Sequence, residues 1–208
     1  MMKKLSLSFF TTQNIAFLSL LSALTIILQL FGNFINFGFA SINLSLIPIA
    51  IGALTLGPIG GFILGLLNGL VVLFSASTIA VFFPLSVFGT VVVCLLKTSV
   101  AGLVAGFIFL PFKSKKHEYL GAFLASICVP IINTLLFSIG FMIFFKEMAK
   151  NNGASNSFTF LIVSIIGINF IFEFLANSLL SSAIFSIYRY SKRKQELKID
   201  TASEVKED

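Results

Sequence analysis

The segment GALTLGPIGGFILGLLNGLVVLF, residues 52–74, lies inside a stretch from Leu5 to Leu96 that contains no Asp, Glu, Lys or Arg. A helix needs about 20 mainly apolar residues to cross the hydrocarbon core of a bilayer. The strands of a transmembrane barrel would instead alternate in polarity over about 10 residues, and the apolar runs in this chain are continuous. The uncharged stretch therefore predicts several closely spaced transmembrane helices.

The composition of the whole chain agrees with a membrane protein. Of 208 residues, 57% are hydrophobic and only 11% are charged, whereas a soluble domain carries about 25% charged residues. This excludes a soluble globular protein, a disordered chain and a nucleic-acid-binding module. At about 20 residues for each span plus short turns, the chain has room for roughly six to seven helices.

The basic residues predict the topology, because short loops rich in Lys and Arg stay on the cytoplasmic side. They form three clusters, which are Lys3 and Lys4; Lys113, Lys115 and Lys116; and Arg189, Lys192, Arg193, Lys194 and Lys198. If all three share one side, the number of spans between them is even, and the intervening lengths fit four spans and then two. We expect an all-α bundle of six transmembrane helices with both termini in the cytoplasm. Residues 1–190 would form one integral-membrane domain of a multi-pass protein of the cell membrane, and residues 191–208 a charged cytoplasmic tail.

Turn-forming residues indicate where the helices end. Gly57-Pro58 predicts a tight turn between the second and third helices, because Pro stops a helix and Gly accepts positive φ. The other expected breaks are the polar exit from the first helix at 32–38, the segment 75–78 after the third helix, Pro84 before the fourth, and a hydrophilic outer loop at 146–157.

Two charged residues fall inside the expected spans, Lys97 in the fourth and Glu173 in the sixth. A charge at the bilayer centre costs about 2.5–3.5 kcal/mol on insertion scales, so each needs a partner or a water-filled cavity. They could pair as a structural link between two helices, or one or both could face a ligand cavity. Asn169 and Asn177 lie four residues on either side of Glu173, which places all three on one stripe of the helix.

Asn133 adds a further amide near the middle of the fifth helix. Together these side chains favour a polar pocket for a small hydrophilic metabolite, and we select Lys97, Asn133, Asn169, Glu173 and Asn177 as candidate substrate-binding residues. No paired carboxylates, Ser–His pair or cluster of metal ligands occurs in the spans, so no catalytic or metal-binding residues are expected.

Small residues characterise the first three helices. Ser19 and Ala23 form a small-x-x-x-small pair in the first, and Gly recurs through residues 52–69. Small residues at these spacings let helix backbones approach closely. They would serve either internal packing or docking of another membrane subunit.

The layout and several local strings resemble the substrate-binding S components of energy-coupling factor (ECF) vitamin transporters. Residues 47–65, IPIAIGALTLGPIGGFILG, resemble the family's pattern for helices 2 and 3. Residues 132–135, INTL, and 168–173, INFIFE, resemble strings of its pantothenate-type branch. In that branch an Arg follows a Pro in helix 4, and Lys97 stands there without the Pro.

The resemblance implies a subunit that binds a vitamin or vitamin precursor, with pantothenate as the first expectation and riboflavin, hydroxymethylpyrimidine or folate as others. Asn133, Asn169 and Glu173 would bond the substrate, Lys97 would pair with its carboxylate or with Glu173, and residues near Asn43 would cap the site. Ser19 and Ala23 would face a transmembrane T subunit, and two ATPase subunits would use the ATP, with no cofactor bound by this chain.

Two other classes of protein remain as alternatives to a transporter subunit. An intramembrane enzyme would need a paired carboxylate, a Ser–His pair or a metal cluster at one depth. A membrane scaffold protein held together by its glycine faces would have sparse, scattered polar residues, whereas in this chain they concentrate in the fourth to sixth helices.

Overall fold

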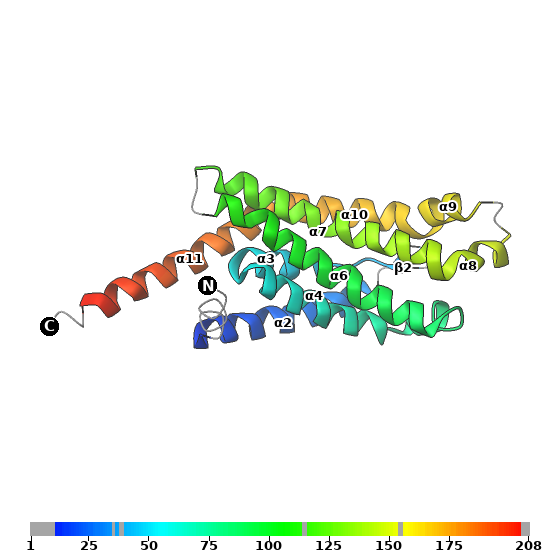
Figure 1. Ribbon diagram of the computed structural model, residues 1–208, viewed down its shortest axis with the longest axis horizontal. Coiled ribbons are helices and arrows are strands. Elements are labelled where there is room, and N and C mark those ends of the chain that lie inside the picture. The colour runs from blue at the N-terminus through cyan, green and yellow to red at the C-terminus, as the bar shows by residue number, and fades with distance from the viewer. Residues whose placement is uncertain (1–10, 35, 38–39, 114–115, 154–155, 205–208) are drawn as a thin grey trace.

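The computed structural model describes residues 11–34, 36–37, 40–113, 116–153 and 156–204. The predictions made for Lys3, Lys4 and Lys115 therefore lie outside the described residues. The described chain forms an elongated bundle in which most helices run roughly along the long axis (Figure 1). The bundle is helical apart from one short hairpin, as the sequence predicts.

In chain order, the elements are α2 (Thr12–Gly32), β1 (Asn36–Phe37), β2 (Ala40–Ser41), α3 (Leu46–Thr55), α4 (Gly57–Leu73), α5 (Ala76–Val81), α6 (Val87–Phe109), the 3₁₀ turn η1 (Leu110–Phe112), α7 (Glu118–Gly140), the π-helical turn η2 (Phe141–Phe145), α8 (Lys146–Asn151), α9 (Ser157–Phe160), the π-helical turn η3 (Leu161–Ile166), α10 (Gly167–Leu179) and α11 (Ser181–Glu204). The two strands pair antiparallel, with Asn36 opposite Ser41 and Phe37 opposite Ala40.

Three helical segments of the described chain are long and apolar enough to cross a membrane, namely 12–32, 87–112 and 118–151. The pair α10 and α11, bent by 45° at Leu180, makes a fourth if it is taken as one span. The apolar helices α3 and α4 have 10 and 17 residues, and at 1.5 Å per residue α3 extends only about 15 Å. The protein is thus a multi-pass membrane protein, and the number of six spanning helices stays a prediction.

Most of the expected breaks are confirmed. α2 ends at Gly32, α4 ends at Leu73 and α6 begins at Val87. Gly57 has φ of +78°, a conformation that favours glycine, and Pro58 occupies the first turn of α4. The prediction of a loop over 146–157 is wrong in its first half, because the helical segment that starts at Glu118 continues to Asn151. A run of apolar residues before Lys146 lets the helix extend past the first charged residues.

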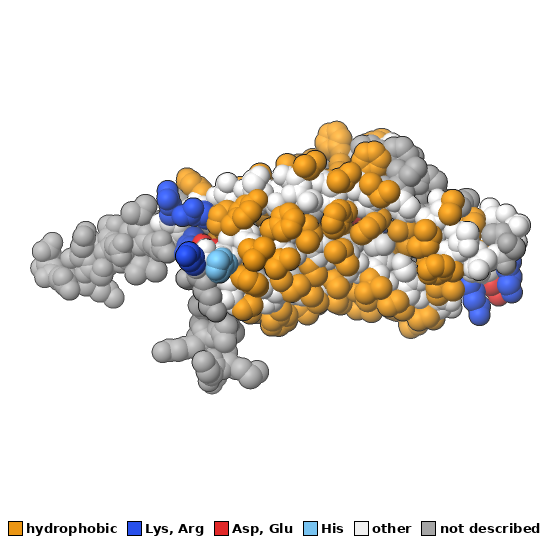
Figure 2. Space-filling model, turned by 90° about the horizontal axis from the view of Figure 1, so that it is seen from above, with side chains coloured by type: hydrophobic (Ala, Val, Ile, Leu, Met, Phe, Trp, Pro, Cys, Tyr) orange, Lys and Arg blue, Asp and Glu red, His pale blue; other side chains and the backbone are white. Residues whose placement is uncertain are grey.

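An apolar belt surrounds the middle of the molecule. Figure 2 shows hydrophobic side chains spread over the visible face, with charged groups gathered towards its two ends. Large exposed side chains such as Leu20, Phe107 and Val163 belong to this belt, at 64%, 57% and 73% exposure. A soluble protein would not expose so much apolar surface, so the belt is the surface in contact with lipid.

At the end of the bundle where the basic residues of α11 lie, a polar contact joins α7 to α11. Tyr188 donates a hydrogen bond to Oε1 of Glu118 at 2.6 Å, and Nζ of Lys192 forms a salt bridge to the same oxygen at 3.0 Å. The start of α2 and the end of α11 lie at this same end (Figure 1). If the chain crosses the membrane an even number of times, its first and last helices must begin and end on the same side, as they do here. That this side is the cytoplasm stays a prediction.

Glycines bring the backbones of α4 and α6 into contact. A Cβ added at Gly61 would meet the backbone of Gly102, one at Gly65 the backbone of Thr98, and one at Gly69 the backbone of Cys94. Thr98 also donates a hydrogen bond from Oγ1 to the carbonyl oxygen of Gly65 at 2.7 Å. These three glycines therefore serve internal packing, the first of the two roles considered for them. We call this contact the glycine seam.

We predict that Gly65→Leu destabilises the protein, since the new side chain would push against the backbone of Thr98. Overpacking of this kind costs about 1–3 kcal/mol, so the thermal unfolding temperature in detergent should fall. Leu66→Phe is the control, because Leu66 is exposed on the outer side of α4. Equal unfolding temperatures for the two variants would contradict the role of the seam.

Candidate ligand-binding cavity

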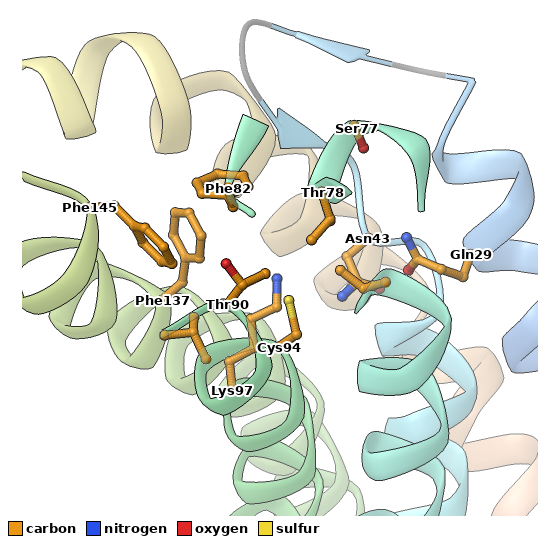
Figure 3. Close-up of a pocket in the computed structure, with 12 residues that line it drawn as sticks. Gln29, Asn43, Ser77, Thr78, Phe82, Thr90, Cys94, Lys97, Phe137 and Phe145 are labelled. Carbon is orange, nitrogen blue, oxygen red and sulfur yellow. The ribbon is translucent and has the colours of Figure 1, made fainter. Parts of the chain in front are cut away.

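A cavity opens between α2, α4, α5, α6 and the segment α7–η2. It encloses about 510 Å³ of empty space, including the open solvent at its mouth. Figure 3 shows phenylalanine rings on one side, Gln29 and Asn43 on the other, and Lys97 between them. The lining residues are Gln29, Asn43, Val72, Ser77, Thr78, Phe82, Thr90, Val93, Cys94, Lys97, Phe137 and Phe145.

Lys97 supplies the positive charge of the cavity. It sits on α6 and is half-buried, and its ammonium points into the open space (Figure 3). Its Nζ lies 5.2 Å from the centroid of the Phe137 ring, within the range of a cation–π contact. The one salt bridge found among the described residues joins Lys192 and Glu118 and does not involve Lys97. Lys97 and Glu173 do not form a salt bridge, so the first of the two alternatives considered for them, a direct link between their helices, is not present as a salt bridge.

Asn43 is the centre of a buried polar network. Its backbone N–H donates to Oε1 of Glu173 at 2.9 Å, which ties the segment after β2 to α10. Its side-chain Oδ1 accepts from Oγ of Ser45 and, at 3.4 Å, from Nδ2 of Asn68. The Ser45 hydroxyl also lies 3.3 Å from Oε1 of Gln29. The network thus joins α2, α4 and α10 through the connection between α2 and α3.

Several amide atoms in this region have no protein partner. They are Nδ2 of Asn43 and the Oδ1 atoms of Asn68, Asn133 and Asn177, all buried. An unsatisfied buried polar atom costs about 1–3 kcal/mol. Asn43 lines the cavity, and its Nδ2 atom is one of these buried atoms without a protein partner.

The five predicted binding residues occupy different positions relative to the cavity. Lys97 lines it. Glu173 is connected to it through Asn43, and Nδ2 of Asn177 donates to the backbone oxygen of Glu173 at 3.0 Å. Asn133, on α7, and Asn169, on α10, are buried at 5% and 6% exposure without being part of the lining.

Sequence reasoning missed several lining residues. Gln29 lines the cavity and Asn68 bonds to Asn43 outside the lining. Both are buried amides in apolar helices, and the rule that selected Asn133 would have selected them also. Thr78 and Thr90 also line the cavity, but they could not be selected from the sequence because Thr is common in membrane helices. The phenylalanines of the lining could not be selected either. Phe82, Phe137 and Phe145 are three of 26 phenylalanines in the chain, and nothing in the sequence distinguishes them.

The predicted docking residues lie on the outer face of α2. Ser19 and Ala23 are both exposed, and the Ser19 hydroxyl donates to the backbone oxygen of Ile15 at 2.9 Å. The opposite face of α2 carries the buried residues Leu21, Thr25 and Gln29. The two small residues are therefore free of packing within the bundle.

A multi-pass helical bundle with a polar cavity enclosed by an apolar belt defines a membrane protein that can bind a small solute. The chain matches the family model described as ECF transporter, substrate-specific component, over residues 13–188, and it belongs to this family. Members are substrate-binding transporter subunits rather than enzymes, and they associate with the transmembrane and ATPase modules of the transporter. No curated protein and no solved structure matches the chain significantly.

We predict that the bond from Asn43 to Glu173 contributes to stability. In Glu173→Gln the side-chain oxygen still accepts from the Asn43 N–H, whereas Glu173→Leu leaves that N–H buried without a partner, at about 1–3 kcal/mol. Thermal unfolding of the ligand-free protein in detergent should therefore show Glu173→Leu below Glu173→Gln. Glu147 is exposed, so Gln and Leu at position 147 should unfold at similar temperatures. If the two Glu173 variants were equally stable, the bond would have no structural role.

Proposed function

We propose that this protein binds a vitamin or vitamin precursor in the cavity and delivers it to the cell through an ATP-driven ECF transporter. The observation that carries the proposal is the cavity itself, which places an ammonium and several amides inside an apolar belt. Polar groups are costly at this depth, and binding a hydrophilic solute offsets that cost. The family match supports the same reading, because its members are substrate-specific components.

The first candidate substrate is pantothenate or a similar molecule, with riboflavin, hydroxymethylpyrimidine and folate as further candidates. The strings at 132–135 and 168–173, which resemble the pantothenate-type branch, support this order. Lys97 would contact the substrate directly. Asn133, Asn169, Glu173 and Asn177 are buried, and we assign them to substrate binding in the loaded protein.

The partners in this proposal are a transmembrane T subunit and two cytoplasmic ATPase subunits in the cell membrane. The ATPase subunits hydrolyse ATP, and this chain holds no cofactor of its own. The exposed pair Ser19 and Ala23 supports docking of the T subunit on α2, because small side chains allow another helix to approach closely. Both termini would face the cytoplasm, on the side of the ATPase subunits.

Binding is tested with the purified protein in detergent and a panel of vitamins, by thermal shift and calorimetry. We expect saturable binding of one compound, weakened about 10- to 100-fold in Asn133→Ala, since a lost hydrogen bond to a ligand costs about 1–3 kcal/mol. Asn152→Ala, an exposed residue at the far end of the bundle, is the control and should bind normally. A panel without any saturable ligand would refute the proposal.

The docking role of α2 is tested by Ala23→Leu. We predict normal vitamin binding by the purified variant but loss of uptake in cells that express the whole transporter, because the larger side chain keeps the T subunit away. Leu30→Phe enlarges another exposed side chain of the same helix and should leave uptake unchanged. Normal uptake by Ala23→Leu would exclude docking at this position.

A further inference from the structure

We propose that the surface formed by the start of α7 and the middle of α11 binds the phosphate group of an anionic phospholipid, with the guanidinium of Arg189 as its main contact. This surface consists of Lys113 and residues 116–120 and 185–193, and we call it the α7–α11 surface. It is separate from the cavity, so the inference goes beyond the proposed function.

Contacts between the two helices bring the parts of this surface together. Tyr188 and Lys192 of α11 both bond Oε1 of Glu118, in the first turn of α7. The ring of Tyr119 packs edge-on against the ring of Phe185, with their centroids 5.3 Å apart. The start of α7 and the middle of α11 therefore form one continuous surface.

Arg189 lies against this surface. Its Cζ is 5.7 Å from the centroid of the Phe185 ring, within the range of a cation–π contact. Long side chains of a helix point towards its N-terminus, which for α11 is the end inside the bundle (Figure 1). Among the described residues, no salt bridge involves Arg189. An exposed guanidinium is thus held towards the membrane with its charge open to an anion.

The neighbouring residues indicate that Arg189 lies where the lipid tails meet water. Leu120 and Ile187 are exposed apolar residues of the belt, and Tyr119 and Tyr190 are also exposed. Tyr is enriched at this depth because its ring is apolar and its hydroxyl polar. A lipid at the α7–α11 surface would place its phosphate at Arg189 and its acyl chains against the apolar belt.

The charge of the surface favours an anionic lipid over a zwitterionic one. Glu118 is the one acidic residue in the segments 113–120 and 185–193, and it is paired with Lys192. The basic side chains that are exposed are those of Lys113, Lys116, Arg189 and Arg193. Basic residues beside a span attract anionic lipids, and the planar guanidinium can bind two phosphate oxygens at once.

Topology alone does not account for this arrangement. The positive-inside rule requires basic residues beside the spans, wherever their side chains point. It does not require Arg189 to lie over Phe185. The surface also lies apart from α2, which packs against α3 and α4, whereas α11 packs against α3 and α7 (Figure 1). A lipid bound there leaves the proposed docking face of α2 free.

The test uses the absence of Trp from the chain, because a single introduced Trp then reports the lipid around it. Tyr119→Trp keeps an aromatic ring beside Phe185. Phe158→Trp places the reporter at an exposed position of α9, at the other end of the bundle (Figure 1). Each protein is reconstituted in phosphatidylcholine bilayers with a small, equal fraction of brominated phosphatidylglycerol or brominated phosphatidylcholine, which quench Trp fluorescence.

We expect the anionic lipid to be enriched about fivefold over phosphatidylcholine around the Trp of Tyr119→Trp, and not around that of Phe158→Trp. Adding Arg189→Gln to Tyr119→Trp should remove most of this preference. Adding Lys150→Gln, at an exposed position of α8, should leave it unchanged. Unfolding temperatures show whether each variant is folded, and Tyr190→Trp replaces Tyr119→Trp as the reporter if the latter is not.

Three outcomes would overturn the inference, namely equal quenching by the two lipids at position 119, the same preference at position 158, or an unchanged preference with Arg189→Gln. A fourth concerns the source of the phosphate. If inorganic phosphate removes the preference and chloride at the same ionic strength does not, the surface binds free phosphate and the lipid proposal is wrong.

Discussion

The glycine seam between α4 and α6 is the contact on which the cavity depends. Gly61, Gly65 and Gly69 recur every four residues on one face of α4, and the hydrogen bond from Thr98 to Gly65 fixes the register of the two helices. Lys97 is the residue before Thr98 in α6. Adjacent residues of a helix point in different directions around its axis, so the Lys97 side chain points away from the seam. Close backbone packing thus sets the direction in which the Lys97 ammonium points.

A second constraint acts at the connection between α2 and α3. The connection between α2 and α3 is not helical, so its backbone groups need partners within the membrane protein. Glu173 meets this need by accepting from the Asn43 N–H, and the side chains of Ser45 and Asn68 add to the same network. Glu173, which the sequence analysis selected as a binding residue, therefore has a structural role in the ligand-free protein. Lys97 is the charged residue that faces the cavity.

Much of the fold was predictable from local chemistry. The turn at Gly57-Pro58 and the ends of α2 and α4 follow from Gly, Pro and Ser, whose effects are local. The continuation of the α7 segment to Asn151 was not, because a helix can carry charged residues once it has left the hydrocarbon. Of the candidate site, Lys97 was found from its cost in the membrane. Which amide reaches the cavity depends on helix rotation and packing, so Gln29 was missed and Asn133 is not part of the lining.

The central claim is that the cavity holds a vitamin or vitamin precursor in the loaded protein. The most direct measurement is mass spectrometry of the small molecules released from protein purified in mild detergent after expression in cells. The account predicts one such compound at close to one molecule for each protein chain, and a reduced amount from Lys97→Met prepared in parallel. Release of no vitamin or vitamin precursor, or equal amounts of the compound from both proteins, would contradict it.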